Sequence, residues 1–553
     1  MSETQTRPAD EWWRSAVVYQ VYPRSFADSD GDGIGDVNGI RARLPYLADL
    51  GVDALWISPW YPSPLLDGGY DVSDYRGVNP DFGTLEDADA LVREAHELGL
   101  RVLIDLVPNH SSWEHPWFKE ALAAGKGSPE RDRFWFRDGK GPDGSEPPTN
   151  WPAAFGGGAW QQIGDVQEDG QWYLHLFDIS QPDFNWDNRE VIEEFDAILR
   201  FWFDRGVDGF RIDVADSMAK DASLPDVVPG PDGVVTRDKY VGHPTYDQPG
   251  VHDIHQRWRM VADTYADTPE GPRVFVAEAW LSPADRLAQY VRPNELHSAF
   301  NFDALRCPWD AEELREVIDH TTEHLWAVGA PATWVLSNHD TIRHRTRYGR
   351  DQGQSQAAAG TVPVDLDLGL RRARAAALLE LALPGGAYIY QGDELGLPEV
   401  EDLPVESLDD PTWERSGHTV RGRDGCRVPI PWGGTEPPYQ FGPGEGQPWL
   451  PQPSDWAGLT AQAQAGDPGS HLSLYKAALK LRREHQALGE GRLEWDEDAP
   501  KGVLSFTRHP GFRCVVNIGD QPIDLPEHAE VLLYSEPLED GKLPVDTTAW
   551  LRA

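Results

Sequence analysis

Cysteine is scarce in this chain of 553 residues, which contains three: Cys307, Cys426 and Cys514. They lie far apart without metal-ligand spacing, so we predict reduced thiols, with neither a disulfide framework nor a cysteine-based zinc site. Long apolar runs are absent too: the N-terminal stretch MSETQTRPADEWW has no apolar segment of signal-peptide length, and no run of about 18 apolar residues follows. We therefore expect a cytoplasmic protein without a membrane partner.

Basic residues are few in relation to acidic ones. There are 49 Lys and Arg against 92 Asp and Glu, which gives a formal net charge of -43. Such a charge repels nucleic acid phosphates and anionic lipid headgroups. We expect a neutral small molecule rather than nucleic acid as the partner, and the assembly could be a monomer or a homodimer.

Short apolar runs typical of buried strands alternate with helical patterns along the chain. Helical stretches such as IRARLPYLADLG and LEDADALVREAHELG end at a glycine that suits a helix C-cap. Eight such repeats predict an α/β fold, a (β/α)8 TIM barrel. The predicted strands are residues 16–22, 54–59, 101–107, 209–215, 274–279, 296–303, 333–339 and 386–392.

Uneven spacing between the strands predicts insertions in the barrel. The segment 110–186 after the third strand is rich in Gly, Pro, Trp and Asp and is predicted to form a small inserted domain B. We assign 1–109 and 187–487 to the barrel, with an inserted subdomain at about 395–460 that is rich in Pro and Gly. Alternating runs from residue 488 predict a C-terminal antiparallel β domain, 488–553. Both insertions should rise from the carboxyl face of the barrel and wall a pocket.

Charged and polar residues gather where the predicted strands end, which is where barrel enzymes hold their catalytic groups. A single Asp at a strand end is more often an ordinary ion-pairing or capping residue, but a set spread over four strand ends predicts a site. Glycoside hydrolysis needs one carboxylate to attack the anomeric carbon and one carboxylic acid to protonate the leaving oxygen. The strand-end residues are Asp105, Asn109, His110, Arg211, Asp213, Glu278, His339 and Asp340.

Local sequence suggests how two of these carboxylates differ. Arg211 precedes Asp213 by two residues, so both side chains should lie on the same side of the strand, and the guanidinium should keep Asp213 ionised. Glu278 lies in the apolar run VFVAEAW, where Trp280 and the aliphatic residues should raise its pKa toward that of an acid catalyst. A buried, paired structural carboxylate is the alternative for Glu278.

Four ordered motifs resemble the α-amylase family of glycoside hydrolases, in its oligo-1,6-glucosidase and α-glucosidase branch. They are DLVPNH (105–110), GFRIDVADSMAK (209–220), VAEAW (276–280) and WVLSNHD (334–340). Supporting matches are GGYDVSDY (68–75), LFDISQPDFNW (176–186), YQGDELG (390–396) and RGRDGCRVPIPW (421–432). The resemblance covers nearly the whole chain up to the final β domain.

The resemblance implies a role for each matching residue. Asp213 would be the nucleophile, Glu278 the general acid/base, and Asp340 the third essential carboxylate, which grips sugar hydroxyls. Residues that would bind the sugar are Asp67 and Tyr70 at the pocket floor, the hydroxyl ligands His110, Arg211 and His339, and either Arg423 or Arg427. Phe155 and Phe177 match wall residues of the family, although core packing would explain each of them nearly as well.

An acidic loop after the first strand could hold a metal ion. Asp28, Asp30 and Asp32 alternate with other residues as in the first half of an EF-hand loop, but Gly39 stands where that loop requires a bidentate Glu. The family resemblance implies a structural Ca2+ or Mg2+ site with Asp28, Asp30, Asp32, Asp36 and the carbonyl of Ile34 as ligands. An acidic solvated turn is the alternative, and no organic cofactor is expected.

The resemblance implies a retaining, exo-acting α-glucosidase that releases glucose from short α-glucosides. A transglucosidase or sugar isomerase with the same covalent intermediate is the alternative, and a non-catalytic interaction subunit is a third reading, disfavoured because no catalytic residue is substituted. In the family the residue after the nucleophile, here Val214, influences linkage choice, and Val often accompanies α-1,6 cleavage. Because VADSMAKDASLPDV is more similar to enzymes that act on maltose, we narrowly favour α-1,4 activity.

Overall fold

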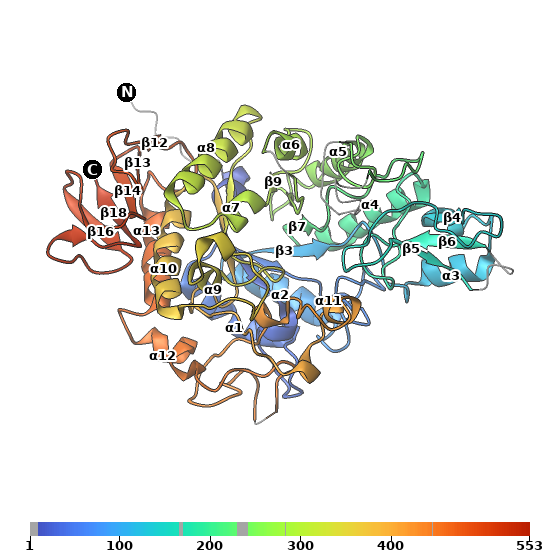
Figure 1. Ribbon diagram of the computed structural model, residues 1–553, viewed down its shortest axis with the longest axis horizontal. Coiled ribbons are helices and arrows are strands. Elements are labelled where there is room, and N and C mark those ends of the chain that lie inside the picture. Colours follow the sequence, from blue (N-terminus) through green and yellow to red (C-terminus); the bar gives the residue numbers. More distant parts are fainter. Residues whose placement is uncertain (1–8, 165–169, 229–241, 282–283, 445) are drawn as a thin grey trace.

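The computed structural model describes residues 9–164, 170–228, 242–281, 284–444 and 446–553, and its centre is a sheet of eight parallel strands (Figure 1). The strand order is β10-β11-β1-β2-β3-β7-β8-β9. Between the two end strands, the Thr333 hydroxyl of β10 donates a hydrogen bond to the Ala299 carbonyl of β9, so the barrel is nearly closed. The strands are β1 (Val17–Val21), β2 (Ala54–Ile57), β3 (Arg101–Leu106), β7 (Gly209–Ile212), β8 (Val274–Ala277), β9 (Ser298–Ala299), β10 (Thr333–Val335) and β11 (Gly386–Tyr390).

Helices cover the outside of the barrel and explain why the strands are apolar on both faces. In α1, Asp36 caps the N-terminus by accepting a hydrogen bond from the Gly39 amide at 2.7 Å, and Gly51 ends the helix with a φ of 99°, as its position in the sequence predicts. The main covering helices are α1 (Val37–Leu50), α2 (Leu85–Glu97), α4 (Arg189–Phe203), α5 (Gly250–Asp263), α8 (Ala311–Ala327), α10 (Leu366–Ala382) and α13 (His471–Glu484).

The predicted (β/α)8 fold is confirmed, and the largest difference concerns the sixth predicted strand, 296–303. The observed strand is only β9, because the Asn301 side chain accepts a hydrogen bond from the Ala304 amide at 3.0 Å and begins the short helix α7 (Phe302–Arg306). Phe302 and Asp303 are therefore helical residues at the barrel mouth instead of strand residues.

The segment between β3 and α4 forms a lobe at one end of the molecule (Figure 1). It contains α3 (Pro116–Ala124) and an antiparallel sheet of β4 (Phe136–Asp138), β6 (Gln171–Leu174) and β5 (Trp160–Gln162). Buried tryptophans, including Trp151 and Trp160, form its core. The Trp151 indole donates to the Pro225 carbonyl at 2.8 Å, which ties this lobe to the chain that follows β7.

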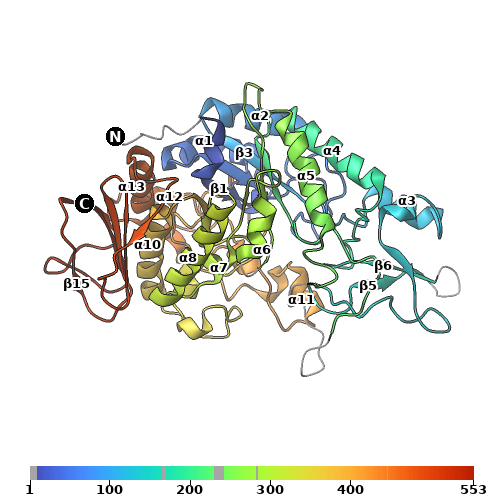
Figure 2. The same cartoon turned by 90° about the horizontal axis from the view of Figure 1, so that it is seen from above.

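A second antiparallel sheet lies at the opposite end of the molecule, as the two views in Figures 1 and 2 agree. Its strands lie in the segment 488–553, where an antiparallel β domain was predicted, and in spatial order they are β12 (Glu494–Trp495), β13 (Val503–Arg508), β14 (Phe512–Asn517), β18 (Thr547–Arg552) and β16 (Glu530–Tyr534). This sheet packs on α10, where the Trp550 indole donates to the Leu378 carbonyl at 3.0 Å.

The segment 395–460 folds mainly as loops around the short helix α11 (Pro411–Arg415). It covers the acidic loop after β1: the Asp28 amide donates to the Phe441 carbonyl at 2.9 Å, and the Trp449 amide donates to the Gly33 carbonyl at 3.0 Å. All three cysteines are buried and free. Throughout the described ranges no helix has the length and apolar character needed to cross a membrane; residues 1–8 of the N-terminal stretch lie outside them.

Candidate active site

A cavity of about 590 Å³ opens at the carboxyl ends of the barrel strands. Both insertions wall it, since Phe155 and Phe177 come from the 110–186 segment and Thr412 and Arg423 from the 395–460 segment. Arg211 and Arg427 do not line the cavity but contact residues that do. The sequence-predicted residues that line it are Asp67, Tyr70, His110, Phe155, Phe177, Asp213, Glu278, His339, Asp340 and Arg423.

One buried guanidinium joins three carboxyl groups beneath the cavity. Arg211 Nη1 lies 2.8 Å from Asp105 Oδ1 and 2.6 Å from Asp213 Oδ1, and Arg211 Nη2 lies 3.5 Å from Glu278 Oε2. Asp105 also accepts hydrogen bonds from the Trp56 indole at 2.9 Å and the Tyr70 hydroxyl at 3.0 Å. Burial nevertheless raises the pKa of Asp105 to about 6.

The Asp213 carboxyl is buried and electrostatically linked to Glu278. Burial raises the pKa of Asp213 well above its ordinary value, Arg211 opposes this rise, and the charge of Glu278 adds to it. The expectation that Arg211 simply keeps Asp213 ionised is therefore incomplete, because the fold adds desolvation and a second carboxylate. Arg211 lies closer to Asp213, at 2.6 Å, than to Glu278, at 3.5 Å, and this shorter contact favours the ionised form of Asp213.

The surroundings of Glu278 differ from the apolar environment expected from its sequence. Trp280 turns its indole N–H toward Glu278 Oε1 and donates a hydrogen bond, rather than covering the carboxylate with its ring. The Val214 amide donates to Glu278 Oε2 at 2.7 Å. Val214 has a φ of 47°, a left-handed conformation that is costly for a β-branched residue. In this conformation its backbone N–H points toward Glu278.

Two arginines hold Asp340, and the structure separates their positions. Arg423 Nη1 and Arg427 Nη2 lie 2.9 Å and 3.2 Å from Asp340 Oδ1. Arg423 lines the cavity with 20% of its side chain exposed, whereas Arg427 is 2% exposed and donates from Nε to the His339 carbonyl. Although burial opposes it, His339 and both guanidinium groups hold the pKa of Asp340 below its usual range. Arg423 is thus the arginine placed to meet a ligand.

The cavity floor combines an ion pair with an aromatic stack. Arg423 Nη2 lies 2.6 Å from Asp67 Oδ1. The Tyr70 and His339 rings stack with centroids 5.1 Å apart and planes 2° from parallel. Burial lowers the pKa of His339 to about 3, so the ring is neutral at pH 7, and its Nδ1 lies 2.7 Å from the Gln20 amide nitrogen.

His110 lies next to Tyr70 and also contacts the inserted lobe. Its Nε2 lies 3.2 Å from the Tyr70 carbonyl and 3.2 Å from the Gln181 amide nitrogen, and Gln181 also donates to Asp67 Oδ2 at 2.9 Å. Burial lowers the pKa of His110 to about 4, so it is a neutral hydrogen-bonding group. Its ring lies 5.0 Å from that of Phe177, which shows that this phenylalanine is part of the cavity wall.

Sequence reasoning missed several residues of the site. Asp410 joins the network by forming an ion pair with Arg423, and nothing in its local sequence identifies that partner. Phe302 and Asp303 end the sixth predicted strand, so the rule applied to the other strand ends would have found them. Val214, expected to influence linkage choice, and Trp280, expected to raise the pKa of Glu278, line the cavity, and the lining residues for which no role was predicted are Ala154, Tyr246, Leu281, Phe302, Asp303, Arg306 and Thr412.

The acidic loop after β1 brings together three of its predicted metal ligands. Carboxylate oxygens of Asp28, Asp30 and Asp36 lie within 4.8 Å of one another. Asp32 lies outside that group, and its Oδ1 accepts a hydrogen bond from the Ile34 amide at 2.8 Å. The three converging carboxylates fit a hard cation such as Ca2+.

Comparisons with known proteins agree with this geometry. The alpha-amylase catalytic domain model matches residues 20–491. A probable alpha-glucosidase of Rhizobium meliloti (strain 1021) is 39% identical, with 94% of this chain and 92% of the relative covered. An oligo-1,6-glucosidase of Parageobacillus thermoglucosidasius is 35% identical over 92% of this chain and 90% of its own. The crystal structure of an alpha-glucosyl transfer enzyme aligns with a TM-score of 0.82 at 35% identity, covering 98% of this chain and 100% of the other.

The fold, the carboxylate-lined cavity and the sequence matches together define a glycoside hydrolase. The chain belongs to the alpha-amylase family, and its relatives place it among the enzymes of that family that act on glucosides. The family match and these relatives contradict the hypothesis that the protein is a non-catalytic interaction subunit.

Proposed function

We propose that the protein is a retaining, exo-acting α-glucosidase that releases glucose from the non-reducing end of short α-glucosides. The observation that carries this proposal is the guanidinium of Arg211, which contacts both Asp213 and Glu278 at the cavity floor. Both carboxyls are held by one cation and line the same cavity, which supports their action on one glycosidic bond.

In the proposed reaction, Asp213 attacks the anomeric carbon while Glu278 donates its proton to the leaving oxygen. The glycosidic bond breaks, the bond from carbon to Asp213 forms, and the aglycone leaves with the proton. Glu278, now ionised, takes a proton from water, whose oxygen displaces Asp213 and restores both groups. Asp340 and Arg423 are placed to bind sugar hydroxyls, which would hold the glucose ring during both steps.

Retention is tested by the anomer of the first product. Two displacements at one carbon should give α-glucose, which then mutarotates, and we expect the α-anomer signal to precede the β-anomer signal in proton NMR of the hydrolysis of an aryl α-glucoside, whose aglycone contributes no second glucose. Glucose supplied as the β-anomer from the first spectrum would contradict the proposed nucleophile. Freshly dissolved α-glucose in the same buffer gives the control rate of mutarotation.

Transfer of glucose to a second sugar is the alternative function. The Trp280 and Phe302 rings stack with centroids 3.6 Å apart, and the guanidinium carbon of Arg306 lies 4.2 Å from the Trp280 ring centroid. These side chains line the cavity, where they would bind an acceptor sugar in place of water. A solved relative is an alpha-glucosyl transfer enzyme. Product analysis at rising maltose concentration distinguishes the two: trisaccharide exceeding free glucose would favour transfer.

We infer that Val214 influences linkage choice, with α-1,4 activity narrowly favoured. Its side chain lines the cavity beside Asp213 and offers no hydroxyl to a sugar. Val214→Thr keeps the β-branched shape and adds a hydroxyl, so it should raise the maltose-to-isomaltose ratio of kcat/KM about two- to twelve-fold, as one hydrogen bond is worth about 0.5–1.5 kcal/mol. Val214→Ile, which keeps the β-branch and adds a methylene but no hydroxyl, is the apolar control. An unchanged ratio in both variants would place linkage choice elsewhere in the cavity wall.

We further propose that Asp28, Asp30 and Asp36 hold a structural Ca2+ or Mg2+ ion, with Asp32 and the Ile34 carbonyl as additional ligands after a small loop rearrangement. The loop is hydrogen-bonded to Phe441 and Trp449, so an ion there would secure the large insertion rather than take part in the reaction. A cytoplasmic compartment remains our prediction for the protein.

Chelation should therefore lower Tm while leaving kcat of the folded enzyme nearly unchanged. An ion bound only by the folded loop stabilises the fold by about 2.7 kcal/mol at a hundredfold excess over Kd. Melting curves with EDTA, and with EDTA followed by excess Ca2+, measure this effect. Asp30→Asn should lose the response, whereas Asp49→Asn on α1 serves as a surface control that keeps it. If EDTA does not change the Tm of the parent protein, the metal-site proposal is wrong and the loop is an ordinary acidic turn.

A further inference from the structure

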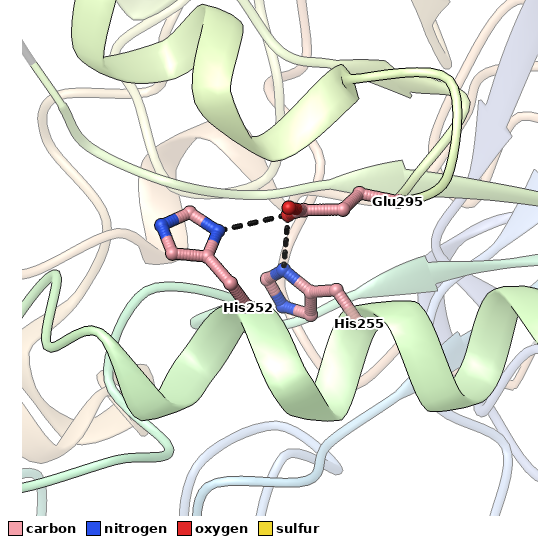
Figure 3. A group of neighbouring side chains, drawn as sticks. All are labelled: His252, His255 and Glu295. Atoms are coloured by element: carbon pink, nitrogen blue, oxygen red, sulfur yellow. Dashed lines mark hydrogen bonds and ion pairs between the residues drawn. The ribbon is translucent and has the colours of Figure 1, made fainter.

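A second cluster of metal-ligating side chains lies outside the cavity (Figure 3). His252 and His255 are three residues apart on α5, so they lie on the same face of the helix. Glu295 approaches them from the loop between the short 3-10 helix η4 (Gln289–Val291) and β9. One ligand atom from each of the three residues lies within 4.8 Å of the others.

The donor atoms of the cluster converge on one carboxylate oxygen. His252 Nδ1 lies 2.8 Å from Glu295 Oε2, and His255 Nδ1 lies 3.9 Å from the same oxygen, so both rings turn Nδ1 toward Glu295 (Figure 3). Zinc–ligand bonds of about 2.0–2.1 Å in a tetrahedral site separate neighbouring ligand atoms by about 3.3 Å. The observed separations bracket this value, and small side-chain rotations would reach it.

Hydrogen bonding within the protein leaves this cluster incompletely satisfied. His255 is fully buried, and neither of its ring nitrogens makes a hydrogen bond of good geometry among the described residues, although the Ala215 carbonyl lies near the ring. A buried imidazole in this state is costly unless another partner is present. Glu295 is also fully buried, and Arg292 Nε donates to its Oε1 at 3.1 Å, which leaves Oε2 for the two histidines.

We propose that His252, His255 and Glu295 bind a divalent transition metal ion, zinc above all, through two imidazole nitrogens and one carboxylate oxygen. Imidazole ligands favour zinc and its neighbours over Ca2+ and Mg2+, which take oxygen ligands. The His252 side chain is 15% exposed, so the fourth coordination position can be filled by water. Glu295 held by Arg292 follows the pattern in which a ligand carboxylate is oriented by a further hydrogen bond.

The role of this metal would be structural. None of the three ligands lines the catalytic cavity. The ion would instead fasten α5 to the loop before β9, behind Ala215, whose amide donates to the Glu278 carbonyl at 2.8 Å. This proposal is independent of the substrate and of the acidic loop after β1.

The test is zinc binding by the full chain after chelator treatment and dialysis, in a buffer with excess Ca2+ that keeps the acidic loop supplied. Competition with a chromophoric zinc chelator should show one tight zinc ion per chain, and Tm should rise with zinc. His252→Gln, at a partly exposed position where folding is preserved, should weaken zinc binding by more than about 100-fold, as should His255→Gln. Co2+ added to the parent should give the intense visible absorption of a four-coordinate N/O site.

The control is the pair His320 and His324, which also lies on one helix, α8, with ring centroids 4.6 Å apart. Neither histidine belongs to the group of converging ligands formed by His252, His255 and Glu295. His320→Gln should leave the tight zinc ion in place. The proposal is overturned if the parent binds no stoichiometric zinc, if His320→Gln abolishes binding while His252→Gln does not, or if bound Co2+ shows only the weak absorption of a six-coordinate ion.

Discussion

Asp213→Asn is expected to lower kcat by about four orders of magnitude or more, with no loss of Tm. The amide cannot form the covalent intermediate, yet it fills the same space and removes a buried charge that burial and Glu278 disfavour. Glu278→Gln should be similarly inactive on maltose, since it cannot protonate the leaving oxygen. Steady-state kinetics and melting curves measure both effects, and retention of about a tenth of the parent activity in either variant would refute its assigned role.

The two carboxyls can be distinguished with azide and an aryl glucoside that has a good leaving group. The first displacement needs little acid assistance with such a substrate, so Glu278→Gln should accumulate the intermediate, and azide should release it as α-glucosyl azide. Asp213→Asn should show no such rescue with retention. The matched control is Asp221→Asn, a partly exposed carboxyl in the same stretch of chain that does not line the cavity, and this variant should keep parental kcat.

Arg211→Met is expected to destabilise the fold by about 3–5 kcal/mol, because removal of one partner leaves buried carboxylates uncompensated. The guanidinium lies within 2.8 Å of both Asp105 and Asp213, and its side chain is 2% exposed. Urea unfolding measures the loss. Arg257→Met is the control, because Arg257 is 44% exposed where it pairs with Asp196, and a surface pair of this kind contributes below about 1 kcal/mol.

The loss in Arg211→Met should depend on pH with a defined sign. Burial already raises the pKa of Asp105 to about 6, above an unfolded value of about 3.9, and loss of the guanidinium raises it further. A carboxyl with a raised folded-state pKa binds more protons when folded, so its contribution to stability falls as pH rises through that interval. The deficit relative to the parent should therefore be smallest near about pH 4 and largest at neutral pH. A deficit that is equal at both pH values would show that packing, not charge, is the cause.

The positions of the catalytic candidates could be predicted because they depend on short-range rules. Residues at strand ends of a parallel barrel converge whatever the helices between them contain, so Asp213, Glu278 and Asp340 were expected to meet in one cavity, and the structure brings them together. The predicted site included no residue from the end of the sixth strand. There Asn301 caps a helix, and Phe302 and Asp303 reach the cavity from that helix.

The sequence by itself determined the barrel, the family and the set of polar residues at the barrel mouth, because strand periodicity and motif order are local properties. Only the tertiary structure decided which of Arg423 and Arg427 faces the cavity. The two arginines lie close together in the sequence and differ in the burial of their side chains. It also decided that burial and the charge of Glu278 raise the pKa of Asp213, and that His255 Nδ1 lies 3.9 Å from Glu295. These three results depend on desolvation or on contacts between segments far apart in the chain. The residues next to each position in the sequence do not determine such effects.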